Sequence, residues 1–145
     1  CRETQQPVPK TPAEICRCIF DSLALRYRQV YGWLKEFANF TPEVLHIIGG
    51  GSLNKYLTQF TANALNVEVL AGPQECTAIG NVMLQAKAAG DVADIWQMRS
   101  IIANSMELVR YDPVDQMQWE MAYDRYLSIV NGIFKNPDVE EQLFK

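Results

Sequence analysis

The chain has 145 residues, with 13 Lys or Arg against 17 Asp or Glu and a formal net charge of −4. Apolar residues make up 48% and charged residues 21%, the balance of a folded protein with one domain, 1–145. A pI near 5.0 excludes a general attraction for nucleic-acid backbones. No apolar run approaches the roughly 20 residues that span a bilayer, so we expect no membrane partner.

The cysteine content indicates the compartment. Four cysteines, Cys1, Cys16, Cys18 and Cys76, are too few for a secreted domain of this size that is held together by disulfides. We therefore expect a reducing, cytoplasmic setting. The sequence begins at Cys1 in a polar stretch, which favours a piece of a longer protein over a processed secreted one.

A long helix is predicted near the beginning of the chain. Residues 1–10 are polar and rich in Pro and Gln, and Thr11, Pro12 and Glu14 then form a capping box with Pro at the first helical position. Apolar side chains recur at helical spacing for about six turns, and Thr41-Pro42 ends the pattern. These apolar positions are Ile15, Ile19, Leu23, Tyr27, Val30, Leu34 and Phe37.

The opposite face of this helix is charged. It carries Arg17, Asp21, Arg28 and Lys35. Amphipathic helices direct their charged face to water, so we expect these four side chains in solvent. Gly32 is a point at which the helix could divide in two.

A strand and a glycine-rich turn follow. Residues 44–48 (VLHII) form a short, nearly continuous apolar run, typical of a strand that is buried on both faces. We expect His46, within this run, to be a core histidine. The run ends at residues 49–52 (GGGS), and a helical pattern over 53–65 begins directly afterwards.

The next elements continue the alternation. Residues 67–70 predict a second strand, and 77–89 a helix of small residues. Asp91 or Asp94 can then cap a further helix that extends through Ile102.

The chain closes with another helix. Residues 115–134 have an amphipathic pattern with Trp119, Tyr123 and Tyr126 on the apolar face. Residues 136–145 begin with a helix-ending Asn-Pro and continue with a charged stretch, so we expect them to form a flexible tail.

Alternating strands and helices predict an α/β fold, rich in helix, with a short parallel sheet and right-handed crossovers. Two strands are too few for a free-standing parallel sheet, because both its faces and its edges need cover. We therefore expect further strands to precede Cys1.

The glycine-rich turn is the segment with chemical information. Gly49, Gly50 and Gly51 lie where a strand ends and a helix begins, the position at which open α/β sheets bind ligands. Glycines allow close approach to the backbone, and a helix N-terminus offers free N–H groups. A tight turn with nothing bound explains the glycines equally well. The turn lacks the Gly-Lys-Ser/Thr of a P-loop, and Asn54 stands where the dinucleotide fingerprint requires a third Gly.

Metal and hydrolase chemistry have little support. Cys16 and Cys18 are two residues apart on a helix, so their side chains lie on nearly opposite faces. No Gly-x-Ser-x-Gly motif occurs, and a single histidine is poor material for a general base. A Cys1–Cys18 pairing is conceivable under oxidation. We expect no metal site and no hydrolase site in this chain.

Several phrases of the sequence resemble one family. They are residues 45–54 (LHIIGGGSLN), 67–75 (VEVLAGPQE), 77–81 (TAIGN), 18–25 (CIFDSLAL) and 1–4 (CRET). Together they resemble the C-terminal domain of the FGGY carbohydrate kinases. The glycine turn is shared throughout that family, and the flanking phrases are closest to members that phosphorylate L-rhamnulose.

The resemblance implies a partial ribonuclease-H-like lobe, the actin and sugar-kinase ATPase fold, with ATP and sugar bound in a cleft between two lobes. This chain would be the distal part of the C-terminal lobe. By that match, Gly50 and Asn54 contact the nucleotide, with Gly49 and Gly51 shaping the turn. The implied reaction transfers the γ-phosphoryl group of ATP to the 1-hydroxyl of L-rhamnulose with Mg²⁺, in rhamnose catabolism.

The family's catalytic base and most of its sugar contacts belong to other segments, so the chain alone is expected to be inactive. Two alternatives stay open at this point. The first is a kinase of the same family for xylulose, fuculose or glycerol. The second is a non-enzymatic α/β module that binds a partner strand, or dimerises, through a sheet edge.

Overall fold

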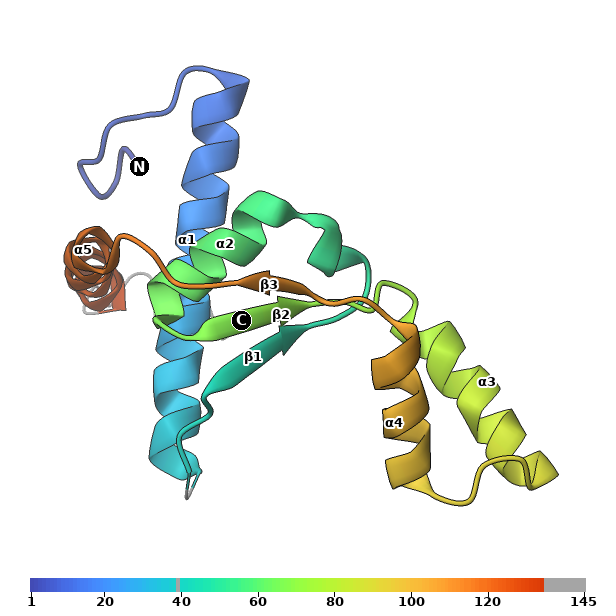
Figure 1. Cartoon of the computed structure of the whole chain (residues 1–145). Helices are drawn as coiled ribbons and strands as arrows, with labels where there is room; N and C mark the ends of the chain where they lie inside the picture. Colours follow the sequence, from blue (N-terminus) through green and yellow to red (C-terminus); the bar gives the residue numbers. More distant parts are fainter. Residues whose placement is uncertain (39, 135–145) are drawn as a thin grey trace, which may run out of the picture.

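The computed structural model describes residues 1–38 and 40–134. Its helices are arranged about one small three-stranded sheet, which they cover on one face (Figure 1). In chain order they are α1 (Pro12–Phe37), β1 (Val44–Ile47), the 3-10 helix η1 (Gly50–Leu53), α2 (Lys55–Leu65), β2 (Glu68–Ala71), α3 (Cys76–Ala89), α4 (Ile95–Ser105), β3 (Val109–Tyr111) and α5 (Gln116–Phe134).

The start of α1 confirms the predicted capping box. The Glu14 N–H donates to Thr11 Oγ1 at 3.2 Å, and the Thr11 N–H donates to Glu14 Oε2 at 3.1 Å. The helix continues unbroken through Gly32. It ends at Phe37, before the predicted stop at Thr41-Pro42, because the backbone turns extended at Ala38.

The sheet combines parallel and antiparallel pairing. β1 and β2 are parallel, with Leu45 opposite Val69, as predicted for the β1–α2–β2 unit. The α/β class with a helix-rich chain is confirmed. β3 pairs antiparallel with the other edge of β2 and was not predicted, because Tyr111-Asp112-Pro113 resembles a loop. The order β1-β2-β3 leaves β1 at one edge of the described sheet.

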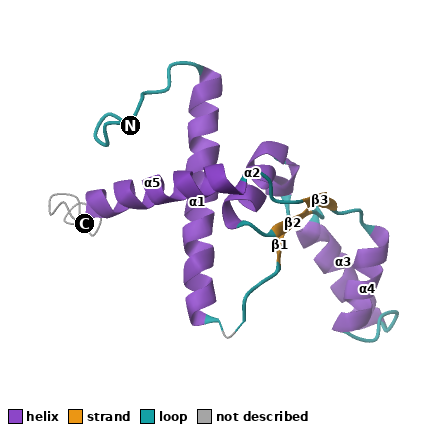
Figure 2. Cartoon of the chain, turned by 60° about the vertical axis from the view of Figure 1, so that its left-hand side comes forward, coloured by secondary structure: helices purple, strands orange, loops and turns teal. Residues whose placement is uncertain are grey.

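The main core lies where α1, α2 and α5 meet. α5 crosses α1, and α2 lies between α1 and the sheet (Figure 2). The core cluster consists of Ala24, Leu25, Tyr31, Ala64, Leu65 and Trp119. Phe60 lies against Trp119, with ring centroids 5.5 Å apart. This packing gives the predicted helix 115–134 a definite place against the first half of the chain.

A second, smaller core holds α3 and α4 together as a hairpin. It is formed by Met83, Val92 and Met98. Asp94 caps α4 as predicted, because its Oδ1 accepts from the N–H groups of Trp96 and Gln97. The hairpin extends away from the sheet on the side opposite α5 (Figure 1).

The orientation of α1 differs from the expectation. The charged face was expected in solvent, but the Arg28 side chain lies between α1 and α5. It is 19% exposed, pairs with Glu120 at 2.6 Å and stacks 4.1 Å from the Tyr123 ring. The Arg17 guanidinium lies over the Phe60 ring at 4.4 Å. The helix therefore packs through its cationic face, where the long Arg stems cover aromatic rings.

The predicted apolar face of α1 is instead exposed. We call its seven side chains the outer stripe. Their exposed fractions are Ile15 44%, Ile19 49%, Leu23 36%, Tyr27 41%, Val30 38%, Leu34 57% and Phe37 88%. Ala24, Leu25 and Tyr31 are the buried residues on the other side of the helix.

β1 is also more exposed than predicted. Val44 and His46 are exposed and lie on one face of the strand, while Leu45 and Ile47 are half-buried on the other. The interpretations of a doubly buried strand and a core histidine are therefore wrong for this chain. The physical reason is that only α1 and α2 supply cover among the described residues, and they pack on the Leu45 side.

Candidate functional site

The glycine turn is joined to the loop that follows β2. The Gly49 N–H donates to the Pro73 carbonyl at 2.9 Å, and the Gly72 N–H donates to the Ile47 carbonyl at 2.8 Å. Ser52 Oγ returns to the Gly49 carbonyl at 2.7 Å. These bonds extend the parallel ladder beyond the strands, so the carboxyl ends of β1 and β2 form one continuous rim.

Each glycine of the turn has a different structural role. Gly49 has φ +78° and ψ −167°, a conformation that is essentially restricted to glycine. Gly50 and Gly51 are exposed, and a Cβ added at either would meet nothing within 4 Å. The first glycine is therefore required by the backbone, and the next two leave space in front of it.

Asn54 closes the turn and caps α2. Its N–H donates to the Gly51 carbonyl at 3.2 Å, and its Oδ1 accepts from the Leu57 N–H at 3.1 Å. The capping bond fixes the amide plane of the half-buried side chain. Asn54 Nδ2 has no hydrogen-bond partner among the described residues, so it can donate to a ligand in front of the turn.

A groove of about 500 Å³ lies beside this rim. Ser52, Leu53 and Lys55 form one wall, and the loop 71–75 forms another. The α4–β3 segment closes it with Met106, Glu107, Val109 and Tyr111. The four predicted site residues, Gly49, Gly50, Gly51 and Asn54, do not line the groove.

Sequence reasoning missed most of the groove. The loop 71–75 could have been included, because the carboxyl ends of neighbouring parallel strands meet at the same edge. Met106 and Glu107 gave no such signal, since they join the rim only through the antiparallel pairing of β3.

The groove is apolar inside and charged at its rim. Leu53, Met106 and Ile79 supply apolar surface, and Lys55, Glu75 and Glu107 are exposed charges. With two carboxylates and one ammonium group at its rim, the groove does not favour the binding of a polyanion such as a triphosphate. A flat, uncharged group such as a nucleobase suits this lining better.

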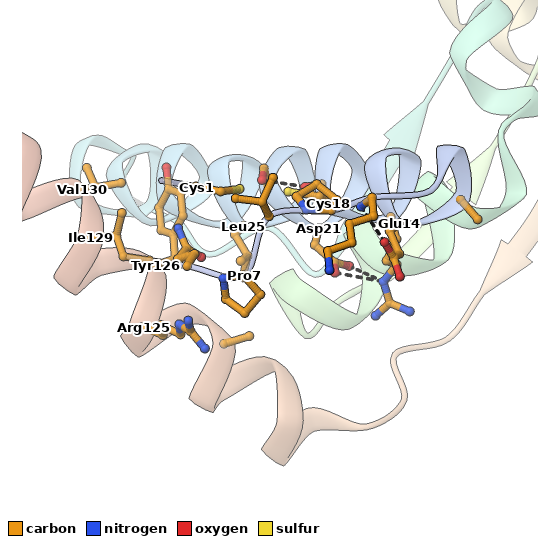
Figure 3. Close-up of a pocket in the computed structure, with 18 residues that line it drawn as sticks. Cys1, Pro7, Glu14, Cys18, Asp21, Leu25, Arg125, Tyr126, Ile129 and Val130 are labelled. Atoms are coloured by element: carbon orange, nitrogen blue, oxygen red, sulfur yellow. Dashed lines mark hydrogen bonds and ion pairs between the residues drawn. The ribbon is translucent and has the colours of Figure 1, made fainter. Parts of the chain in front are cut away.

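A larger groove, of about 1050 Å³, lies between residues 1–10, α1 and α5 (Figure 3). Its polar groups are engaged locally. Glu14 Oε2 accepts from the N–H groups of Lys10 and Thr11, and Arg17 Nε donates to Asp21 at 2.8 Å. Cys1 and Cys18 also line it, and none of its lining residues belongs to the glycine turn.

The described residues contain no group of three His, Cys, Asp or Glu side chains that could hold a metal ion, so we assign no Mg²⁺ ligand to this chain. All four cysteines, Cys1, Cys16, Cys18 and Cys76, are free thiols. None of the helices described combines the length and hydropathy that a membrane crossing requires.

Three curated relatives are similar to most of the chain, and each is named rhamnulokinase. The protein of Bacteroides thetaiotaomicron is 51% identical over 130 residues, 90% of this chain and 27% of the relative. That of Pectobacterium carotovorum is 48% identical over 113 residues, which are 78% of this chain and 23% of the relative. That of Ligilactobacillus salivarius is 40% identical over 131 residues, 90% and 27% of the two. The chain thus spans about a quarter of the length of these relatives.

The family comparison covers the part of the chain that builds the rim. Residues 2–89 match the C-terminal domain of the FGGY family of carbohydrate kinases. This stretch includes α1, the glycine turn, both parallel strands and α3. The match therefore includes the predicted site residues, and the chain belongs to the FGGY family of carbohydrate kinases.

Proposed function

We propose that the chain is the C-terminal portion of an ATP-dependent sugar kinase that phosphorylates L-rhamnulose at its 1-hydroxyl. Its role there is to supply the nucleotide side of the cleft, and it is inactive alone. The observation that carries this proposal is the glycine turn at the carboxyl end of β1, in a chain 40–51% identical to three rhamnulokinases. We assign the protein to the cytoplasm and to rhamnose catabolism on the same basis.

The geometry of the turn supports adenosine as its ligand. Gly50 and Gly51 are bare of side chains and face open space, so a flat base or a ribose can lie against the backbone. Asn54 Nδ2 is then placed to donate a hydrogen bond. The apolar groove between Leu53 and Met106 adjoins this surface and suits the base rather than the phosphates.

In the complete protein, Mg²⁺-ATP would supply the γ-phosphoryl group, which passes to the sugar hydroxyl while the metal ion neutralises charge on the phosphates. This chain contributes binding and orientation. Gly49 shapes the turn, Gly50 and Gly51 admit the nucleoside, and Asn54 fixes its orientation. We assign neither the catalytic base nor the sugar contacts to residues of this chain.

The direct test is a coupled phosphorylation assay on the complete protein, with L-rhamnulose, L-fuculose, D-xylulose and glycerol compared side by side. Preference for L-rhamnulose supports the proposal. Preference for another of these substrates would support a kinase activity but contradict the assignment of L-rhamnulose as the substrate. No turnover on any of the four, from a folded protein, contradicts the proposal and favours an interaction module.

Two substitutions test the nucleotide site itself. Asn54→Ala removes both the cap and the amide donor, so we expect a higher KM for ATP and an unchanged KM for the sugar. Asn54→Ser keeps a capping oxygen but removes the amide donor, and should raise the KM for ATP without the stability loss of about 1 kcal/mol expected for Ala. An unchanged KM for ATP in both variants would contradict this site assignment.

A further inference from the structure

The outer stripe of α1 has the pattern of a buried helix face. Its residues follow one another at intervals of three or four, so they lie on a single face. α1 has 26 residues, so the stripe runs along a helix about 39 Å long. The opposite face is already packed through Ala24, Leu25 and Tyr31. α1 therefore packs on one side, through these three residues and Arg28, and carries a row of exposed apolar side chains on the other.

The exposure of the stripe is unusual for a free monomer. Phe37 is 88% exposed and Leu34 57%, and five more apolar side chains are between 36% and 49% exposed. Isolated exposed apolar residues are normal, but a continuous row along a whole helix marks an interaction surface. The seven side chains of the stripe are all uncharged.

Two further observations indicate what covers it. β1, which follows α1 in the chain, pairs only with β2 among the described residues, and its other edge is open although parallel strands are normally interior. The chain also spans only 23–27% of the length of its rhamnulokinase relatives. The exposed apolar face of α1 lacks a covering layer, and the open edge of β1 lacks a neighbouring strand. Both could be supplied by the remaining part of the same polypeptide.

We infer that the outer stripe is the docking face for the rest of a full-length kinase polypeptide, and that it is buried there as core. A second copy of the chain is the competing occupant. The remainder is favoured over it because about three quarters of the length of the relatives lies outside this chain. The inference rests on the proposed function only in taking the remainder to be that of an FGGY kinase.

The experiment is a thiol-protection measurement on two proteins. One is the 145-residue chain. The other is a chimera in which this chain replaces the matching segment of the Bacteroides thetaiotaomicron rhamnulokinase. With the four native cysteines replaced by serine, Val30→Cys places a probe in the stripe and Glu36→Cys a control on the same helix outside it. Maleimide labelling is followed by mass spectrometry, beside light scattering and circular dichroism of both proteins.

We expect Val30→Cys to label rapidly in the monomeric chain and at least roughly tenfold more slowly in the chimera, because a buried thiol reacts only after local opening. Glu36→Cys should differ less between the two proteins. Equal labelling of Val30→Cys in the chain and in a folded chimera overturns the inference. A dimer of the chain alone that protects Val30→Cys overturns it in favour of a second copy.

A second measurement covers a chimera that does not fold. The chain is then co-expressed with the remainder of the Bacteroides protein as a separate polypeptide. Co-purification that Val30→Glu abolishes and Glu36→Gln preserves supports the inference, and absence of co-purification with the unsubstituted chain opposes it. None of these readouts depends on catalytic activity. If the stripe is protected in a complete protein that phosphorylates none of the four sugars, this inference holds while the proposed function fails.

Discussion

At the scale of single residues, adjacent glycines in the turn separate stability from ligand binding. Gly49 has φ +78°, and Gly50 has open space where a Cβ would stand. We expect Gly49→Ala to lower the free energy of unfolding by about 1–3 kcal/mol, the cost of forcing a side chain into that conformation. Gly50→Ala should change it by less than about 0.5 kcal/mol.

The two substitutions are compared by urea unfolding of the chain and by the KM for ATP in the complete protein. In the latter, Gly50→Ala should raise the KM, because its methyl group occupies the space in front of the turn. Equal destabilisation by both substitutions would show that the structure misassigns the residue that carries the positive φ.

The capping carboxylate of α1 makes stability depend on pH. The N–H groups of Lys10 and Thr11 donate to Glu14 and hold its pKa below the usual value of 4.5. A depressed pKa means that the unfolded chain takes up the proton first, so the stabilising contribution is present above pH 4.5 and is lost as the pH falls through the folded-state pKa.

We therefore expect Glu14→Gln to lower Tm at pH 6 and to converge with the unsubstituted chain as the pH falls below 4.5. Thermal unfolding between pH 7 and pH 3 measures the difference. Glu36→Gln, on the same helix but without a capping bond, is the control for overall charge. A difference in Tm between Glu14→Gln and the unsubstituted chain that stays constant over this range would contradict the capping role.

At the scale of elements, α5 contributes one buried residue, Trp119, to the core cluster. Trp119 is 7% exposed and packs against Phe60, while Met117, on the same helix, is 78% exposed. We expect Trp119→Ala to reduce the free energy of unfolding by about 3–5 kcal/mol, the usual loss for a large buried aromatic. Met117→Ala should change it by less than about 0.5 kcal/mol. Urea unfolding of both variants checks this, and similar effects would mean that α5 is not docked as described.

Local chemistry determined which elements could be predicted. The Thr11–Glu14 capping box and the Asp94 cap depend on neighbouring residues only, so the starts of α1 and α4 follow directly from the sequence. β3 has three residues and exists through its pairing with β2, a contact between distant parts of the chain. β3 was not predicted because it depends on this distant contact. The residues of the groove near β3 were missed for the same reason.

The direction of α1 could not be predicted for a different reason. Helical spacing shows that Ile19 and Val30 share a face, but not which layer covers that face. Arg28 was expected in solvent because a charge is costly to bury, yet Glu120 and the Tyr123 ring compensate for that cost. The glycine turn itself follows from local sequence, whereas Gly50 and Asn54 were assigned to the nucleotide through the resemblance to the FGGY kinases. Their role in binding stays a prediction.

At the scale of the whole molecule, the chain is a small sheet with helices that extend in three directions (Figures 1 and 2). In the proposed function it presents one wall of the nucleotide cleft, and Gly50 and Gly51 of that wall are exposed. A ligand that is contacted by one wall alone lacks the contacts that the opposite wall of a closed site would add.

We therefore expect the isolated chain to bind ATP more weakly than the complete protein by at least roughly tenfold, or about 1.4 kcal/mol. It should also show no phosphorylation of L-rhamnulose. Isothermal titration of both proteins with ATP measures the difference. Equal affinity would mean that the turn and its surroundings form a complete nucleotide site by themselves.

The burial of Trp119 also has an optical consequence. The three tryptophans lie on three different helices, and Trp33 and Trp96 are 43% and 69% exposed. Their indoles already emit in a largely aqueous environment, whereas that of Trp119 emits from an apolar one. A red shift of the emission spectrum therefore reports the release of α5 from α1 and α2, so the chain needs no added dye to show when this helix detaches.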